Sequence, residues 1–470
     1  MSVDGKQKFD LIVIGSGPGG YPAAIYAAQH DKKVALIEAG EIGGTCLNRG
    51  CIPSKALIAG AEQWKAVQHA KEFGIQIDKA SFDYSAMVQR SQKIVTEIRT
   101  SLEKLILANQ IEIFRGHGVL ASKNTVRVKG DKTSLLEADA IILATGSEPR
   151  LLPQFPFDGK YIVDSTSLLK RETLPKSIAI IGAGVIGCEF ASLFSLLGVP
   201  VTLLELLPQI LPAEDPDLSL ELTNALKKRG VAIHCNAQVT QIEKTGSGVK
   251  IHQQKGSPLE AELALIAVGR SLNTDNLKLS SVGVAVNQQG LIVIDEEMQT
   301  TVPGIYAVGD IASKWWLAHV ATHQGIVAAS NICGLPKKMR YEAIPSVTFT
   351  DPEIASVGLT LEAAKAKGYD AGIGAFPFQA LGKSRASGHT EGFAKVVIDR
   401  ATGQILGAQV AAHDASTLIA EMVLAIENEI PIECVAETIH AHPTTSEAWL
   451  EAAMAGIFMP LHLFPTHRKG

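Results

Sequence analysis

The sequence predicts an α/β protein that contains two copies of one strand–turn–helix–strand unit. A GxGxxG glycine pattern begins at Gly15 and recurs 167 residues later at Gly182. In both places it follows a short apolar run and precedes a helical stretch. The composition agrees, because the 470 residues are 46% hydrophobic but only 5% aromatic, and 42 of them are glycine. Such a chain builds aliphatic cores and many tight turns, as α/β proteins do.

The first unit has the order of a nucleotide-binding fold. It consists of residues 10–14, the glycines Gly15, Gly17 and Gly20, a helix to about residue 29, and residues 34–37. Glycines at these positions let the backbone approach a pyrophosphate at a helix N-terminus. Glu38 ends the second strand, 18 residues after Gly20, where it can accept a hydrogen bond from a ribose hydroxyl. The unit therefore predicts a dinucleotide site.

The second unit repeats this order. It consists of residues 177–181, the glycines Gly182, Gly184 and Gly187, a helix to about residue 197, and residues 201–204. Glu205 follows, and its carboxylate would repel the 2'-phosphate of NADP, with no arginine in residues 206–209 to offset it. Further strands at 141–146 and 263–269 each close on a small-residue turn, as expected of a duplicated fold. Two dinucleotides are implied, a flavin and NAD.

Residues 43–57, GGTCLNRGCIPSKAL, place Cys46 and Cys51 five positions apart. In a near-helical segment this spacing allows a disulfide if the backbone distorts slightly, and a strained, partly exposed pair suits exchange chemistry. The alternative interpretation is that the two cysteines form half of a metal-binding site. No metal is expected, because the other cysteines stand singly, at Cys188, Cys235, Cys333 and Cys434. Since the pair follows Glu38 closely, the first unit is assigned FAD and the second NAD.

With both cysteines in place, residues 43–57 resemble the redox segment of the flavoprotein disulfide reductases, and in particular of the dihydrolipoamide dehydrogenase family. The resemblance covers essentially the whole chain. It implies NAD-dependent oxidation of protein-bound dihydrolipoamide through the disulfide and FAD. It also implies an FAD-binding domain at 1–148, an NAD-binding domain at 149–270, a central domain that completes the FAD site at 271–343, and an α+β dimerisation domain at 344–470.

The resemblance assigns roles to single residues. Cys46 exchanges with the substrate, Cys51 lies against the flavin, and Lys55 pairs with Glu189 beside it. Asp310 in TVPGIYAVGD matches the residue that binds the ribityl chain, whereas Gln324 stands where many relatives have Glu. The FAD-binding residues are predicted to be Gly15, Gly17, Gly20, Glu38, Gly44, Thr45, Lys55, Ala144, Thr145, Gly146, Asp310, Leu317, Ala318 and His319, and the NAD-binding residues Gly182, Gly184, Gly187, Glu205 and Gly269.

A catalytic base is predicted near the end of the chain. Pro443 biases His442 away from helical geometry, and Ser446 is expected to cap a helix that begins at about Glu447. The imidazole should therefore lie on a loop that faces outward. HPTTSE resembles the family's base, His442, with its orienting carboxylate, Glu447. The resemblance further implies a homodimer in which His442 completes the disulfide site of the other subunit.

Two other patterns concern the fold. Residues 58–110 are predicted to be helical, with Ile94, Ile98, Leu102 and Leu105 in the core because they recur every three or four positions. Alternating runs at 394–398 and 405–410 predict an antiparallel hairpin.

The net charge of −5 and the lack of a long basic run argue against nucleic-acid or membrane binding. The first nine residues lack the apolar core of a signal peptide, so a cytoplasmic protein is expected. The partners implied by the resemblance are lipoyl domains, the subunit-binding domain of an acyltransferase component, and the lipoyl protein of glycine cleavage. The sequence leaves open which complex is served. The alternative from another functional class is a flavoprotein without enzymatic activity, in which the two cysteines only support the flavin.

Overall fold

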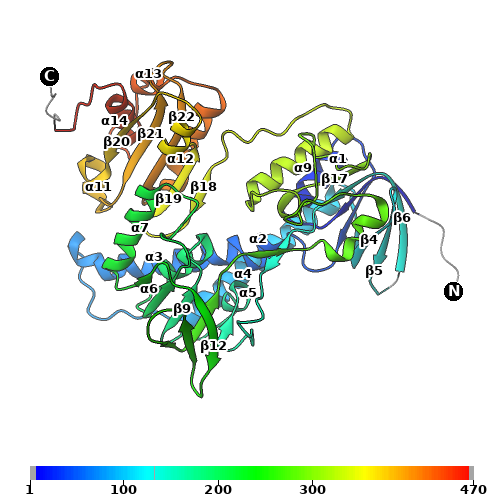
Figure 1. Ribbon diagram of the computed structural model, residues 1–470, viewed down its shortest axis with the longest axis horizontal. Coiled ribbons are helices and arrows are strands. Elements are labelled where there is room, and N and C mark those ends of the chain that lie inside the picture. Colours follow the sequence, from blue (N-terminus) through cyan, green and yellow to red (C-terminus); the bar gives the residue numbers. More distant parts are fainter. Residues whose placement is uncertain (1–6, 132, 465–470) are drawn as a thin grey trace.

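The computed structural model describes residues 7–131 and 133–464, whose strands form five sheets. Figure 1 shows three lobes. The first lobe contains the sheet around β1 and β6, the second the sheet around β9, and the third the sheet around β22. Nowhere in these two ranges is a helix both long and apolar enough to cross a membrane.

The first lobe contains the first predicted unit. Its elements are β1 (Gln7–Ile14), α1 (Gly20–Ala28), β2 (Val34–Glu38), α2 (Gly44–Arg49), α3 (Cys51–His69), η1 (Ala70–Phe73), α4 (Tyr84–Ala108), β3 (Glu112–Arg115), β4 (His117–Ser122), β5 (Thr125–Lys129), β6 (Thr133–Leu143), η2 (Asp275–Leu277), α8 (Leu279–Val282), β17 (Ile305–Ala307), η3 (Gly309–Ile311) and α9 (Ala318–Ile332). The seven-stranded sheet has the order β3-β2-β1-β6-β5-β4, with β17 parallel to β6. Strand β1 is parallel to both neighbours, β2 and β6. This confirms the predicted strand–helix–strand order.

The second lobe contains the repeat. Its elements are β8 (Ile162–Val163), α5 (Ser165–Leu168), β9 (Ile178–Ile181), α6 (Val185–Leu196), β10 (Val201–Leu204), α7 (Pro216–Lys228), β11 (Ala232–His234), β12 (Val239–Lys244), β13 (Val249–Gln253), β14 (Leu259–Ala261) and β15 (Leu263–Ile266). The main sheet is parallel, in the order β11-β10-β9-β15-β8, and β9 is buried throughout, as parallel strands under helices usually are. Two short strands, β7 (Ser147–Pro149) and β16 (Arg270–Leu272), pair where the chain enters and leaves this lobe.

The third lobe is α+β. Its elements are β18 (Ser346–Thr348), β19 (Glu353–Gly358), α10 (Leu361–Ala366), β20 (Ala371–Pro377), η4 (Phe378–Ala380), α11 (Gly382–Ser387), β21 (Phe393–Asp399), β22 (Ile405–Ala412), α12 (Ala415–Glu427), α13 (Ile432–Glu437) and α14 (Glu447–Gly456). The antiparallel order is β18-β19-β22-β21-β20, so the predicted hairpin is confirmed. Helices α12 and α14 cover the sheet, and the indole N–H of Trp449 donates to the carbonyl of Leu418 at 2.9 Å.

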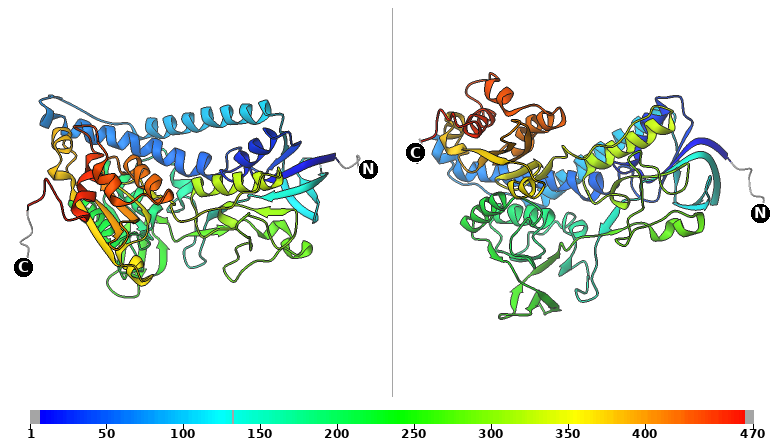
Figure 2. Two further views of the ribbon diagram at one scale, coloured as in Figure 1. Left: turned by 90° about the horizontal axis from the view of Figure 1, so that it is seen from above. Right: turned by 45° about the horizontal axis from the view of Figure 1, so that its top comes forward.

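Helix α3 connects the lobes. It runs beside α4 (Figure 2) and reaches from the first lobe to the third (Figure 1). Its buried Leu57 packs in one core cluster with Phe194 of the second lobe and Ile354 of the third. The helical prediction for residues 58–110 is wrong at residues 74–83, which separate η1 from α4. The core prediction is wrong for Ile98 and Leu105, which are 41% and 50% exposed, because α4 turns Val88 and Val95 inward instead.

Candidate active site

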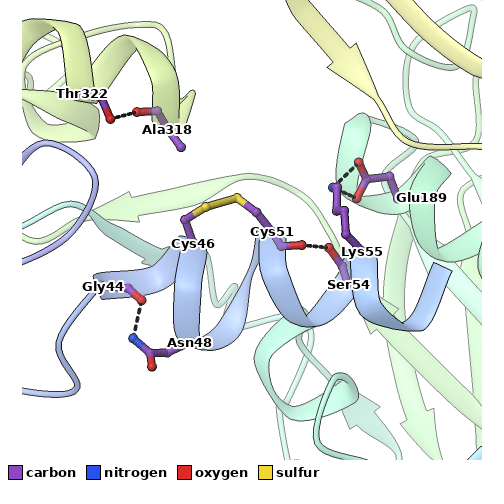
Figure 3. The surroundings of a disulfide bond; sticks show 9 residues. All are labelled: Gly44, Cys46, Asn48, Cys51, Ser54, Lys55, Glu189, Ala318 and Thr322. Atoms are coloured by element: carbon purple, nitrogen blue, oxygen red, sulfur yellow. Dashed lines mark hydrogen bonds and ion pairs between the residues drawn. A yellow bond between two sulfur atoms is a disulfide. The ribbon is translucent and has the colours of Figure 1, made fainter. Parts of the chain in front are cut away.

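The two cysteines form a disulfide at a break between helices. Cys46 lies in α2, Cys51 begins α3, and their Cα atoms are 4.7 Å apart (Figure 3). In one continuous helix, residues five apart would point about 140° away from each other. The chain avoids this at Gly50, whose φ of −142° and ψ of −110° interrupt the helix. The predicted backbone distortion is therefore located at a single glycine.

The disulfide lies on the wall of a cavity of about 930 Å³. The cavity is lined by the glycine turn of the first lobe, by α2 and α3, by the start of α9, and by α6 of the second lobe. Among the residues predicted to bind FAD, all except Gly20 line it. A volume of this size, between a glycine turn and a redox disulfide, suits an extended dinucleotide.

The glycines of the first turn serve two different purposes. A Cβ on Gly15, which has a φ of +102°, would lie 2.3 Å from the carbonyl oxygen of Ala144, and one on Gly20 would lie 1.8 Å from that of Gly15. These two glycines are needed for packing. A Cβ on Gly17 would have only the Cα of Gly44 nearby, at 3.8 Å, and Gly17 lines the cavity. Its missing side chain therefore leaves room for a ligand.

We predict that Gly17→Ala lowers FAD affinity by at least about tenfold, because the added methyl group occupies the space of the pyrophosphate. The unfolding temperature of the flavin-free variant should stay near that of the wild type. Flavin titration and thermal unfolding check both points. Gly15→Ala is the matched comparison, and it should destabilise the flavin-free protein. A Gly17→Ala protein that binds FAD normally would contradict this view of the cradle.

Glu38 is held in place by the turn it follows. One carboxylate oxygen accepts hydrogen bonds from the backbone N–H and the hydroxyl of Ser16, at 2.8 and 2.6 Å, and the other accepts from the N–H of Gly40 at 2.7 Å. A carboxylate offers about four lone-pair positions, so one remains for a ribose hydroxyl. Glu38 lines the cavity.

A lysine–glutamate pair lies one helical turn from Cys51. The ammonium of Lys55 contacts both carboxylate oxygens of Glu189 in α6, at 2.8 and 2.9 Å (Figure 3). It also lies 4.2 Å from the ring centre of Phe349, whose N–H donates to Glu189 at 3.1 Å. Glu189 is only 8% exposed. The partners fix a positive charge on the cavity wall beside the disulfide.

Asp310 faces the cavity from η3. The hydroxyl of Ser147 donates to its carboxylate and in turn accepts from the Nε of Arg270 at 2.6 Å. The preceding N–H, that of Gly309, donates at 2.8 Å to the side-chain carbonyl of Gln324, which is fully buried. Glutamine thus supplies the acceptor for this turn without placing a buried charge beside the cavity.

His319 lies at the cavity, near the start of α9. Burial lowers the pKa of its imidazole, although the hydrogen bond to the carbonyl of Pro345, at 2.9 Å, acts the other way. The ring is therefore neutral at pH 7. Because a carbonyl can only accept, Nε2 must carry the proton and Nδ1 is left as an acceptor.

The second glycine turn copies the first, but its three glycines lie outside the cavity. Glu205 accepts hydrogen bonds from the N–H groups of Ala183 and Leu207, at 2.6 and 2.8 Å, as Glu38 does from Ser16 and Gly40. A Cβ on Gly184 or Gly269 would have no atom within 4 Å. None of the five residues predicted to bind NAD lines the large cavity, but Glu189 on the following helix does. Helix α6 thus connects the second glycine turn to the cavity.

His442 and Glu447 form a pair in the third lobe. Nδ1 of His442 lies 2.8 Å from one carboxylate oxygen of Glu447, whose other oxygen accepts the N–H of Thr444 at 2.8 Å. The imidazole is 77% exposed, as predicted, and does not line the cavity of its own chain. The predicted cap is wrong, because Ser446 makes no side-chain cap bond and its hydroxyl pairs with Thr444 instead.

The pair predicts a pH dependence. Burial acts to raise the pKa of Glu447, but the hydrogen bonds from Thr444 and His442 outweigh it and hold the pKa below its usual 4.5. A carboxylate with a depressed pKa stabilises the fold above its ordinary pKa, and this contribution is lost as the pH falls through the folded-state value. Glu447→Gln should therefore cost stability above the ordinary pKa of the carboxyl group, and this cost should shrink as the pH falls below about 4.5. Unfolding of both proteins across this range checks it; a difference unchanged at about pH 3 would contradict it.

Comparison with known proteins identifies the class. Residues 9–325 match the family described as pyridine nucleotide-disulphide oxidoreductase, and residues 344–453 match the dimerisation domain of that family. This chain belongs to that family.

Individual similar proteins show which members of this family the chain resembles. The chain is 50% identical to the dihydrolipoyl dehydrogenase of Chlamydia pneumoniae, over 98% of this chain and 99% of that protein. It is 40% identical to the dihydrolipoyl dehydrogenase of Geobacillus stearothermophilus, over 97% of each. Among solved structures, LpdA from Mycobacterium tuberculosis superimposes with a TM-score of 0.89 at 30% identity, over 94% of this chain and 99% of LpdA.

These matches confirm the predicted family, the fold class and the cofactors FAD and NAD. The dimerisation domain supports a homodimer. Sequence reasoning missed Phe349, Ser147 and Ser16. Ser16 lies between two predicted glycines, so its position was a usable signal. The contact of Phe349 with Glu189 joins residues 160 positions apart and has no local signal.

Proposed function

We propose that this protein is a dihydrolipoyl dehydrogenase, which oxidises protein-bound dihydrolipoamide to lipoamide and reduces NAD to NADH. The observation that carries the proposal is the Cys46–Cys51 disulfide on the wall of the cavity, one turn from the Lys55–Glu189 pair. The near full-length similarity to dihydrolipoyl dehydrogenases supports the choice of substrate.

The reaction begins with a proton transfer. His442 of one subunit faces the disulfide of the other, and its Nε2 removes a proton from one thiol of dihydrolipoamide, since Nδ1 faces Glu447. A free thiol is mostly protonated near neutral pH, so a base is required. Glu447 sets the ring orientation and stabilises the imidazolium that forms.

The thiolate attacks the Sγ of Cys46, and the bond to Cys51 breaks with its electron pair on Cys51. The second substrate thiol then attacks the substrate sulfur of the mixed disulfide and closes lipoamide. Cys46 leaves as a thiolate and takes up the proton that the second thiol loses. Cys51 lies at the N-terminus of the 19-residue helix α3, where a thiolate is stabilised. Lys55, fixed by Glu189, adds a positive charge nearby.

The chain's own groups hold both cofactors. The glycine turn, Glu38, Asp310 and the start of α9 would hold FAD, and the second glycine turn with Glu205 would hold NAD. Bound FAD would supply the two-electron chemistry that connects the reduced cysteines to hydride transfer to NAD. The exposed Leu206 and Leu207 after Glu205 offer no cation to a 2'-phosphate, which favours NAD.

The lipoyl substrate places this protein in a multienzyme setting. The proposed partners are the lipoyl domains and the subunit-binding domain of an acyltransferase component, or the lipoyl protein of glycine cleavage, and the proposed location is the cytoplasm.

The test is NADH formation by the FAD-loaded dimer with dihydrolipoamide and NAD. Turnover is expected with NAD and should be at least about tenfold slower with NADP, because Glu205 repels the 2'-phosphate. Reduced glutathione in place of dihydrolipoamide should give little NADH. A flavin-loaded protein that does not turn over dihydrolipoamide would favour another thiol or a non-enzymatic role.

A further inference from the structure

The three lobes meet at one buried carboxylate, Asp351, in the turn between β18 and β19 of the third lobe. Both oxygens of Asp351 contact the ammonium of Lys65 in α3, at 2.8 and 2.7 Å. One of them also contacts the guanidinium of Arg229, which follows α7 of the second lobe directly, at 3.0 Å. Asp351 is 8% exposed. One anion thus binds two cations that come from two other lobes.

The backbone on either side of Asp351 adds a second set of contacts. The N–H of Asp351 donates to the hydroxyl of Ser192 at 3.0 Å, and the N–H of Phe349 donates to Glu189 at 3.1 Å. Ser192 and Glu189 lie one turn apart on the same face of α6. The segment 349–351 therefore lies along α6 and contacts α3 at two points, near Lys55 through the ring of Phe349 and at Lys65 through the carboxylate.

We propose that Asp351 is a positioning residue for the redox centre. It fixes α3, which begins at Cys51 and carries Lys55, against α6, which carries Glu189. Asp351 touches neither the cavity nor the disulfide, so its effect passes through α3. This inference rests on the proposed function only for its effect on turnover.

The physical reason is that α3 is a single rigid helix. Its N-terminal end presents Cys51 and Lys55 to the cavity, and Lys65 lies ten residues after Lys55 in the same helix. Loss of the Asp351 charge leaves Lys65 and Arg229 facing each other at a partly buried junction without their shared anion. Unpaired buried charges are costly, and small displacements of catalytic groups lower rates strongly.

The test compares Asp351→Asn with Glu214→Gln in the FAD-loaded protein. Glu214 is a matched control, because its carboxylate also joins the second and third lobes, through the hydroxyls of Ser346 and Ser356 at 2.7 and 2.6 Å. Among the residues that the structure describes, Glu214 makes no hydrogen bond or ion pair with α3. Each substitution removes one carboxylate charge and nearly preserves shape.

Hydrogen exchange of residues 51–69 is the first measurement, and it needs no substrate. In Asp351→Asn these amides should exchange about tenfold faster than in the wild type, whereas β22 keeps its protection. In Glu214→Gln, residues 51–69 should be unchanged. Unchanged exchange of this helix in Asp351→Asn, or an equal increase in all three lobes, would overturn the proposal.

Kinetics with dihydrolipoamide and NAD are the second measurement. Asp351→Asn should lower kcat about tenfold with KM for dihydrolipoamide within about twofold, because the substrate does not contact Asp351. An unchanged kcat would overturn the proposal. If Asp351→Asn does not fold, Lys65→Met takes its place, with the same expected directions and the same overturning results. A wild-type protein without dihydrolipoamide activity would refute the proposed function, while the exchange comparison would still decide the role of Asp351.

Discussion

Cys46→Ser should abolish NADH formation from dihydrolipoamide and NAD while FAD stays bound. A serine oxygen cannot form the disulfide with Cys51, so the enzyme loses both its electron acceptor and the sulfur that the substrate thiolate attacks. Loss of the Cys46 sulfur, which the substrate thiolate attacks, should lower kcat by about four orders of magnitude or more, as removal of a covalent catalyst usually does. FAD should be retained because Glu38, Asp310 and the glycine turn line the cavity independently of the sulfur atoms.

The matched control for this variant is Cys434→Ser. Cys434 is an exposed free cysteine in α13 and does not line the cavity. Its kcat should equal that of the wild type within about twofold, since surface substitutions are usually near neutral. A Cys46→Ser protein that keeps more than about one tenth of wild-type turnover would show that electrons bypass the disulfide.

Mixing two inactive proteins should restore activity if His442 acts across the dimer. His442→Gln should lower kcat by about two to four orders of magnitude, because the substrate thiol loses its base. With random subunit exchange between equal amounts of His442→Gln and Cys46→Ser proteins, half of the dimers are mixed, and one of their two sites is intact. The mixture should therefore reach about one quarter of wild-type activity.

A mixture of His442→Gln and Glu447→Gln proteins is the control. Both substitutions affect the same histidine–glutamate pair, which in a mixed dimer is damaged on both subunits, so no rescue is expected. Verified subunit exchange without any rescue in the Cys46→Ser mixture would contradict the arrangement in which His442 completes the partner's site.

The two strand–turn–helix–strand units and the cysteine segment were predictable because the residues that indicate each of them lie close together in the sequence. The order of strand, glycine turn, helix and acid fixed the predicted positions of Gly15, Gly182, Glu38 and Glu205, and the structure shows both carboxylates bound by equivalent backbone N–H groups. The disulfide was also predictable from the cysteine spacing. Two cysteines five positions apart need only a local break in the helix, and Gly50 provides that break between α2 and α3.

The contacts between lobes were not predictable from local patterns. Asp351 and Phe349 contact residues far away in the sequence, and neither stands in a motif that signals those contacts. Helical spacing identified an apolar face on α4, but Ile98 and Leu105 are exposed within one chain. Ser446 has the residue type of a helix cap, but its backbone is itself helical, with φ −66° and ψ −21°, and its hydroxyl pairs with Thr444. Residue type alone therefore gave the wrong contact.

The most direct measurement is to reduce the FAD-loaded protein with NADH, without oxygen and without any lipoamide, and to alkylate and map its cysteines. Electron transfer between NAD, FAD and the disulfide predicts new alkylation at Cys46 and Cys51 and none at Cys188 or Cys235. Burial raises the pKa of both latter thiols, which therefore stay protonated and react slowly in either state. If NADH bleaches the flavin but Cys46 and Cys51 are still not alkylated, the disulfide does not take part in the electron transfer and the protein does not oxidise dithiols through it.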